Sequence, residues 1–284
     1  MAIPKRTVLI TGCSNGGLGA ALAIALHEAG LHVYATARTP SKMAHLTSLG
    51  IETMTLDVLS DPSITACVNQ ISSLDILINN AGAGYTMPVS DISIPEAKKL
   101  FDLNVWSYLA VTQAFLPLLL KSKGMIVNQT SIASVATVPF ASAYGASKAA
   151  MAMFSTSQRL ELAPFGITVI ELKTGIVRSN FITNHQKQSK LPSHLPENSI
   201  YSPARAIVEK ALTQDEFTDK GMRAEEWAKG VARDILKGKT PIVWRGEEAF
   251  LARIASCLPF GWFDGLVRKM TGLDLVEQII KARG

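Results

Sequence analysis

Short apolar runs alternate with longer helix-like stretches along most of this 284-residue chain. The apolar runs are rich in β-branched residues and end at turn residues, so they predict strands. They span residues 7–11, 31–37, 51–58, 74–79, 125–130, 167–172 and 241–244. The stretches between them predict helices over residues 17–30, 41–50, 61–73, 95–121, 141–165 and 222–237. Continuous apolar strands alternating with helices predict an α/β fold, a doubly wound parallel sheet covered on both faces.

Residues 178–202 interrupt this regularity. The segment contains two prolines, two histidines and two lysines. A long irregular segment of this kind is either a solvated surface loop or a lid over a substrate. As a lid it would bring apolar and cationic residues to the substrate, namely Phe181, Ile182, His185, Lys187 and Lys190.

The last segment, residues 247–284, predicts helices with unusually many large apolar side chains. These side chains are Phe250, Leu251, Leu258, Phe260, Trp262, Phe263 and Leu266. They suit the protein core, a subunit contact, or a helix that lies on a membrane surface. We therefore divide the chain into one large domain, residues 1–246 with its lid at 178–202, and a helical C-terminal extension, residues 247–284.

Composition excludes several classes of protein. The net charge is +5, yet dense runs of basic residues with interleaved aromatic residues are absent, which argues against a nucleic-acid partner. The three cysteines are widely spaced and show no metal-ligand pattern, which favours a reducing, intracellular compartment. We also expect neither a signal peptide nor a membrane-spanning helix, because the N-terminus is short and polar and no apolar run is long enough.

A glycine-rich string occupies residues 11–19, directly after the first predicted strand and at the start of the first predicted helix. Glycines there let the backbone approach a pyrophosphate, and the helix N-terminus supplies free N–H groups to it. The alternative is a purely structural turn, and the spacing leaves open whether Ser14, Asn15 or Gly16 faces the phosphates. The candidate cofactor contacts are Gly12, Ser14, Asn15, Gly17, Leu18 and Gly19.

The end of the second predicted strand favours NADPH over NADH. An NAD site needs an acidic residue at this point to accept hydrogen bonds from the ribose hydroxyls. This chain has Arg38 instead, whose guanidinium can bind a 2′-phosphate, and Lys42 follows about one helical turn later. The alternative is that both are surface residues without a ligand.

Two further strand ends carry candidate cofactor contacts. Asp57 and Val58 follow the third strand, where the carboxylate and the next N–H suit an adenine ring, although an Asp at this point also caps helices. Asn80, Ala81 and Gly82 follow the fourth strand, where small residues would let a cofactor lie against the backbone.

Four residues form the candidate catalytic set. Tyr144 and Lys148 are four apart on a predicted helix and share one face. The ammonium would stabilise the phenolate and so lower a pKa that is otherwise too high for catalysis at neutral pH. Ser131, just after the fifth strand, could bind the substrate carbonyl oxygen. Asn104 lies inside a predicted helix. It is either an exposed polar residue, or it bends the helix and bonds Lys148 through water to complete a proton relay.

These motifs resemble the short-chain dehydrogenase/reductase family from residue 7 to about 179, and more loosely to 244. The resemblance implies a seven-stranded Rossmann-type fold, a catalytic set of Ser131, Tyr144, Lys148 and Asn104, and nicotinamide contacts from Val177 and Ser179. It also implies a homodimer or homotetramer. Three features depart from the family pattern. These are the lengthened glycine turn, Thr174-Gly175 in place of Pro-Gly, and Ser107 in place of Gly.

Four features point to a subgroup of that family: the lengthened glycine turn, Ala37-Arg38 after the second strand, Lys173-Thr174-Gly175 after the sixth, and the apolar tail. Together they resemble fungal NADPH-dependent acyldihydroxyacetone-phosphate reductases. This resemblance implies a small-molecule, lipid-like ketone as substrate, and a cytoplasmic enzyme or one peripheral on the endoplasmic reticulum or lipid droplets. Similar sequences are ketoreductases of fungal secondary metabolism, acting on polyketide, terpenoid or steroid-like ketones or alcohols. Two other interpretations are a different reaction at the same site and a catalytically silent NADP-sensing module.

Overall fold

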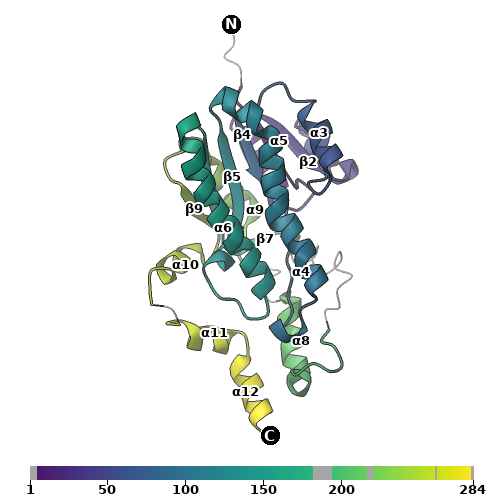
Figure 1. Cartoon of the computed structure of the whole chain (residues 1–284), viewed down its shortest axis with the longest axis vertical. Helices are drawn as coiled ribbons and strands as arrows, with labels where there is room; N and C mark the ends of the chain where they lie inside the picture. Colours follow the sequence, from purple (N-terminus) through teal and green to yellow (C-terminus); the bar gives the residue numbers. More distant parts are fainter. Residues whose placement is uncertain (1–4, 182–193, 216–219, 260, 283–284) are drawn as a thin grey trace.

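The structure, a computed structural model, describes residues 5–181, 194–215, 220–259 and 261–282. Its centre is a sheet of seven parallel strands in the order β3-β2-β1-β4-β5-β6-β9, which confirms the predicted doubly wound architecture (Figure 1). The strands are β1 (Thr7–Ile10), β2 (His32–Ala37), β3 (Glu52–Thr55), β4 (Ile76–Asn79), β5 (Met125–Ser131), β6 (Thr168–Thr174) and β9 (Ile242–Arg245). Two short strands, β7 (Val177–Arg178) and β8 (Met222–Arg223), pair separately.

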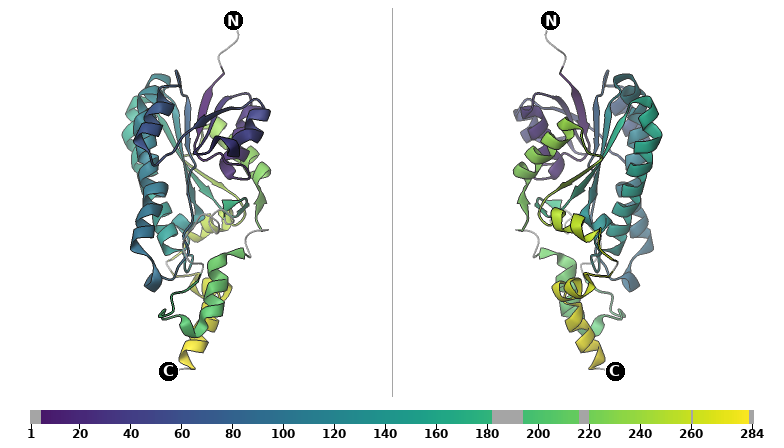
Figure 2. Two further views of the ribbon diagram at one scale, coloured as in Figure 1. Left: turned by 90° about the vertical axis from the view of Figure 1, so that its right-hand side faces the viewer. Right: turned by 90° about the vertical axis from the view of Figure 1, so that its left-hand side faces the viewer.

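Helices cover both faces of the sheet, as Figure 2 shows with the sheet seen edge-on. One face packs against α1 (Leu18–Glu28), α2 (Ala44–Ser48) and α9 (Ala224–Lys237). The other packs against α3 (Asp61–Val68), α5 (Ser107–Ser122) and α6 (Ser142–Leu162). The other α-helices of the described residues are α4 (Ile94–Phe101), α8 (Arg205–Thr213), α10 (Ala249–Ala255), α11 (Asp264–Met270) and α12 (Leu273–Lys281).

The continuous apolar strands produce this three-layer arrangement. Side chains alternate across a strand, so Val8 and Ile10 of β1 pack into the α1/α9 layer and Leu9 packs into the α3/α5 layer. All three are fully buried. Burying such a side chain stabilises the fold by about 1.5–3 kcal/mol, so a strand that is apolar on both faces is held in the middle layer.

The helix predicted over residues 95–121 contains an irregularity. α4 continues through a π-helical turn, η3 (Asp102–Trp106), into α5. A π-turn inserts an extra residue into the helical ladder and often occurs at functional sites. By length and composition this helix, Ile94–Ser122, could cross a membrane, contrary to the expectation from sequence. However, Phe115 and Leu119 are fully buried against the sheet, as in the core helix of an α/β domain.

Only part of the predicted lid lies within the described residues. Ile182, His185, Lys187 and Lys190 fall outside them. The later part, together with η6 (Ser202–Ala204) and α8, joins an apolar cluster beside the carboxyl edge of the sheet. This cluster is formed by Tyr85, Met87, Leu100, Phe140, Leu195, Ala204, Val208, Leu212 and Val276.

The C-terminal extension is helical as predicted, and α11 and α12 extend beyond the sheet at one end of the molecule (Figure 1). Val276 of α12 is buried in the cluster at the carboxyl edge. Most of the large side chains are not buried within the chain, since Phe250 is 73% and Trp262 is 69% exposed. The interpretation that these residues belong to the core of the chain is therefore wrong for most of them. Phe260 lies outside the described residues.

Candidate active site

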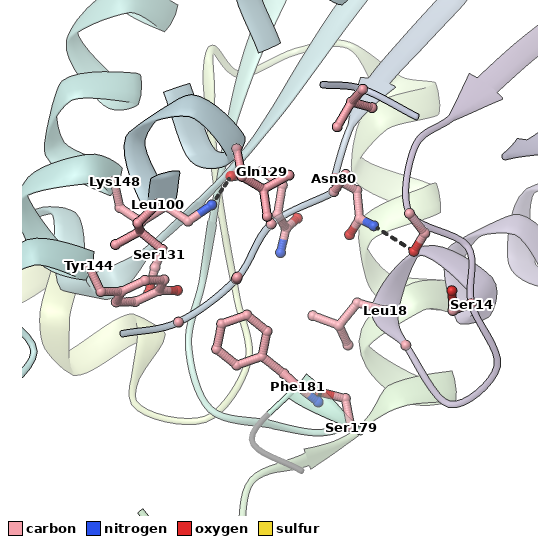
Figure 3. A pocket seen from close by; sticks show the side chains of 18 of the residues that line it. Ser14, Leu18, Asn80, Leu100, Gln129, Ser131, Tyr144, Lys148, Ser179 and Phe181 are labelled. Atoms are coloured by element: carbon pink, nitrogen blue, oxygen red, sulfur yellow. Dashed lines mark hydrogen bonds between the residues drawn. The ribbon is translucent and has the colours of Figure 1, made fainter. Parts of the chain in front are cut away.

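A cavity of about 480 Å³ lies at the carboxyl ends of the central strands (Figure 3). Parallel strands bring their carboxyl ends to one edge, so residues far apart in sequence meet there. The site residues predicted from sequence that line this cavity are Gly12, Ser14, Gly17, Leu18, Arg38, Asp57, Val58, Asn80, Ala81, Gly82, Ser131, Tyr144, Lys148, Val177 and Ser179. Four others do not line it, namely Asn15, Gly19, Lys42 and Asn104.

The glycine-rich turn is shaped by close backbone contacts. Gly12 has φ +76°, and a Cβ on it would lie 2.9 Å from the Cα of Ala81. Gly19 faces inward, where a Cβ would lie 2.6 Å from the carbonyl oxygen of Gly12. The hydroxyl of Thr11 accepts hydrogen bonds from the N–H groups of Asn80 and Ala81 at 2.9 and 3.0 Å. These contacts join the turns after β1 and β4 into one cradle.

The structure also shows which residue of the lengthened turn faces the cavity. Ser14 lines it, whereas the N–H of Asn15 donates to the carbonyl oxygen of Lys42 at 2.9 Å. Gly16, at φ +71°, packs against the side chain of Asn180. The extra residue is thus accommodated on the outer side of the turn, and the N-terminus of α1 stays open toward the cavity.

The opposite end of the cavity contains Arg38, Asp57 and Val58. Arg38 is exposed at the wall, while Lys42 contributes only its backbone to the neighbouring turn. Asp57 is not the cap of α3, because Ser60 occupies that position and accepts from the N–H of Ser63. The Asp57 carboxylate accepts from the N–H of Leu59 at 3.1 Å, which keeps it beside the cavity.

Three candidate catalytic residues meet at the inner end of the cavity. Ser131 ends β5, and its hydroxyl accepts from the N–H of Ala133 at 3.1 Å. Tyr144 and Lys148 both point from α6 toward Ser131 and the strand end (Figure 3). The Nζ atom of Lys148 donates to the carbonyl oxygen of Gln129 at 3.0 Å. Lys148 is 4% exposed, and this burial lowers its pKa to about 8.

The pKa of Tyr144 is raised, whereas the sequence predicts that the Lys148 ammonium lowers it. Burial raises it, and a hydrogen bond with Ser131 opposes that rise. Burial raises the pKa by more than this hydrogen bond lowers it, so the phenol pKa stays above its usual value. The phenol is protonated at neutral pH and is available as a proton donor.

Asn104 lies on η3, fully buried just outside the cavity. Its amide bonds both backbone groups of Ala83, accepting from N–H at 2.9 Å and donating to the carbonyl oxygen at 3.0 Å. It also donates to the hydroxyl of Ser147 at 3.0 Å. Asn104 therefore ties the turn after β4 to α6, and the water relay to Lys148 stays a prediction.

Several residues at the site were not singled out from the sequence. The ring of Tyr108 lies 5.5 Å from Lys148 Nζ, and its hydroxyl donates to the Gln129 carbonyl oxygen at 3.3 Å. Gln129 also lines the cavity. Phe181, by contrast, is one of the lid residues expected at the substrate, and it lines the cavity and packs near Tyr144. Position could have indicated two of them, since Tyr108 is one turn after Asn104 and Gln129 is two residues before Ser131 on the same strand face.

Comparison with known proteins gives the family. Residues 6–190 match the family model described as short chain dehydrogenase. A short-chain dehydrogenase/reductase of Pestalotiopsis microspora is 55% identical over 282 residues, covering 99% of each chain. The NADPH-dependent 1-acyldihydroxyacetone phosphate reductase of Schizosaccharomyces pombe is 37% identical, covering 95% of each chain. A short-chain dehydrogenase structure from Streptomyces avermitilis is 25% identical with a TM-score of 0.74, covering 98% of this chain and 99% of that one.

This chain belongs to the short-chain dehydrogenase/reductase family. Its members are oxidoreductases that act on alcohol or ketone groups with a nicotinamide cofactor. The glycines let the backbone pack closely around a cavity that fits such a cofactor, since a Cβ at Gly12 would lie 2.9 Å from the Cα of Ala81 and one at Gly82 would lie 3.0 Å from Oδ1 of Asn104.

Proposed function

We propose that this protein is an NADPH-dependent reductase of a ketone on a hydrophobic, lipid-like substrate such as acyldihydroxyacetone phosphate. The observation that carries the proposal is the position of Tyr144. Its phenol lies beside Ser131 at the inner end of the cavity, and its ring packs against Phe181 and the apolar cluster at the carboxyl edge. The site therefore pairs a proton donor with an apolar wall.

The protonation of these residues favours reduction. When bound, the nicotinamide supplies a hydride to the carbonyl carbon. Ser131 and Tyr144 bind the carbonyl oxygen, and Tyr144 gives its phenolic proton to that oxygen as the alcohol forms. The Lys148 ammonium stabilises the resulting phenolate until a proton from water restores the phenol. The raised pKa of Tyr144 keeps the proton in place before the reaction.

The preference for NADPH rests on charge. Arg38 and Asp57 line the same end of the cavity, and an Arg after β2 in place of an acidic residue suits a 2′-phosphate. The Schizosaccharomyces pombe relative is named as NADPH-dependent, which supports the same choice. Titrations of NADPH and NADH against the unmodified protein test it, and equal affinity for the two would contradict it.

A second candidate function is reduction of a bulky neutral ketone of secondary metabolism. It is favoured by the pairing of Lys99 with Glu96 at 2.7 Å on α4, where both line the cavity. The other cations on the described cavity wall are Arg38 and Lys148, which have the roles proposed above. The described residues therefore provide the substrate with no uncommitted positive charge for a phosphate.

One experiment distinguishes the two substrates. NADPH oxidation is followed by absorbance with acyldihydroxyacetone phosphate and with steroid, retinal, polyketide and terpenoid carbonyls, and Tyr144→Phe serves as the blank. Turnover of the acyl phosphate alone supports the first proposal, and turnover of a neutral ketone alone supports the second. Silence across the panel with NADPH bound would favour oxidation of an alcohol or a sensing module.

The exposed apolar side chains of the extension require an explanation of their own. We propose that they contact a second subunit or a lipid surface, because patches of this kind mark interaction sites. Surface substitutions, Phe250→Ser with Trp262→Ser, keep the buried Val276 in place. Loss of vesicle flotation in the double variant indicates the lipid surface, whereas a smaller mass in solution indicates the subunit contact. No change in either measurement refutes the proposal.

A further inference from the structure

The side chain of Gln129 has an unusual position for an amide. It lies on β5 two residues before Ser131, so both side chains leave the same face of the strand. Gln129 is 7% exposed and lines the cavity. In Figure 3 it lies between Lys148 and Asn80, beside the catalytic residues.

Only one of the two polar atoms of this amide has a hydrogen-bond partner. Its Nε2 atom donates to the hydroxyl of Thr174 at 2.8 Å, and Thr174 faces Ser131 across the β5–β6 pair. Its Oε1 atom is buried and has no hydrogen-bond partner among the residues that the structure describes. A buried carbonyl oxygen without a donor is costly, so a ligand that brings an N–H or O–H group to it is favoured.

The chemistry of the candidate ligands identifies the donor. A ketone oxygen only accepts hydrogen bonds, so the substrate carbonyl cannot satisfy Oε1. We expect the ribose hydroxyls of the cofactor to bind at the Lys148 ammonium and the Tyr144 phenol. The carboxamide NH₂ of the nicotinamide is the remaining donor at the catalytic end of the cofactor, and Val177 and Ser179 line the same cavity.

We propose that Gln129 binds the cofactor by accepting a hydrogen bond from the nicotinamide carboxamide NH₂ through Oε1. Thr174 bonds the Nε2 side of the amide and leaves Oε1 as the atom without a partner. The contact would fix the orientation of the carboxamide and, with it, the ring face that is turned toward the ketone. This inference rests on the proposed function only in placing the nicotinamide beside Ser131 and Tyr144.

The test measures binding, without substrate. Gln129→Met keeps the length of the side chain and removes the amide. Dissociation constants are measured by tryptophan fluorescence for NADPH, for its 3-acetylpyridine analogue, and for 2′,5′-ADP. The analogue keeps the carbonyl but lacks the NH₂ group, and 2′,5′-ADP lacks the nicotinamide altogether. We expect NADPH to bind about three- to tenfold more weakly, with the other two ligands unchanged.

Two further variants control for structural damage. Gln158→Met removes a different amide, one that bonds Asn128 of β5 outside the cavity, and should leave all three affinities unchanged. Thr174→Val keeps the Gln129 amide but frees its Nε2 atom. It should weaken NADPH less than Gln129→Met does and should leave the analogue unchanged. Thr174→Val also keeps the proposal testable if Gln129→Met does not fold.

Three results would overturn the proposal. Equal weakening of NADPH and the acetylpyridine analogue would mean that Gln129 does not recognise the NH₂ group. Weakening of 2′,5′-ADP as well would indicate general damage to the cavity. Unchanged NADPH affinity would exclude the contact. A silent ketone panel would refute the reductase assignment without changing these binding comparisons.

Discussion

Tyr108 provides a sharp prediction about how the pKa of Lys148 is set. The Lys148 ammonium lies 5.5 Å from the centre of the Tyr108 ring, and no carboxylate of the described residues contributes to its pKa. Tyr144, on the same helix as Lys148, also lines this end of the cavity. Replacing the ring in Tyr108→Leu therefore removes a contact that favours the charged form of Lys148.

The size of the effect follows from the contact. A buried cation–π contact contributes about 0.5–2 kcal/mol, and one pKa unit corresponds to about 1.4 kcal/mol. Loss of the ring should therefore lower the Lys148 pKa by about 0.4–1.5 units. That pKa is about 8 in the intact protein. Because the mechanism needs the ammonium, the alkaline limb of kcat/KM should move to lower pH.

The assay is kcat/KM against pH with the best ketone of the panel. Tyr108→Phe is the matched control, since it keeps the ring and removes only the hydroxyl that bonds the Gln129 carbonyl oxygen at 3.3 Å. Its alkaline limb should stay within a few tenths of a pH unit of the unmodified enzyme. Packing damage in Tyr108→Leu would lower the rate at all pH values without moving the limb. Equal limb shifts in both variants, or none in Tyr108→Leu, would refute the reasoning.

Three further variants test the remaining parts of the site. Tyr144→Phe should keep NADPH affinity within about twofold and lower turnover by about 100- to 10,000-fold, the usual contribution of a general acid; turnover within tenfold of the intact enzyme would contradict the assignment. Arg38→Asp should weaken NADPH about 10- to 100-fold, the loss of a charge-assisted contact, and leave NADH nearly unchanged; equal losses in the two titrations would exclude a phosphate contact. Lys148→Met should raise the free energy of unfolding at pH 7 by about 1–3 kcal/mol in denaturant titrations, because it removes a buried charge. Burial lowers the Lys148 pKa from 10.5 to about 8, so the cost of the charge is full below pH 8 and disappears above pH 10.5. A gain that persists unchanged at pH 11 would show that charge is not its origin.

The amino-acid sequence by itself determined the sheet and the family. The strand-forming runs are local features, and the two-sided apolar character of residues such as Val8 and Leu9 already requires helices on both faces. The glycine-rich turn and the Tyr144–Lys148 spacing are also local, because one turn of helix separates residues that must act together.

Only the tertiary structure decided which side chains face the cavity. Ser14 and Asn15 are neighbours in sequence, yet only Ser14 lines it, because Asn15 bonds the backbone of Lys42. The unpartnered oxygen of Gln129 depends on Thr174, 45 residues away, which holds the other half of the amide. The exposure of Phe250 and its neighbours likewise depends on what the rest of the chain leaves uncovered. Such features arise from contacts between distant segments, which hydrophobic periodicity and motif spacing do not encode.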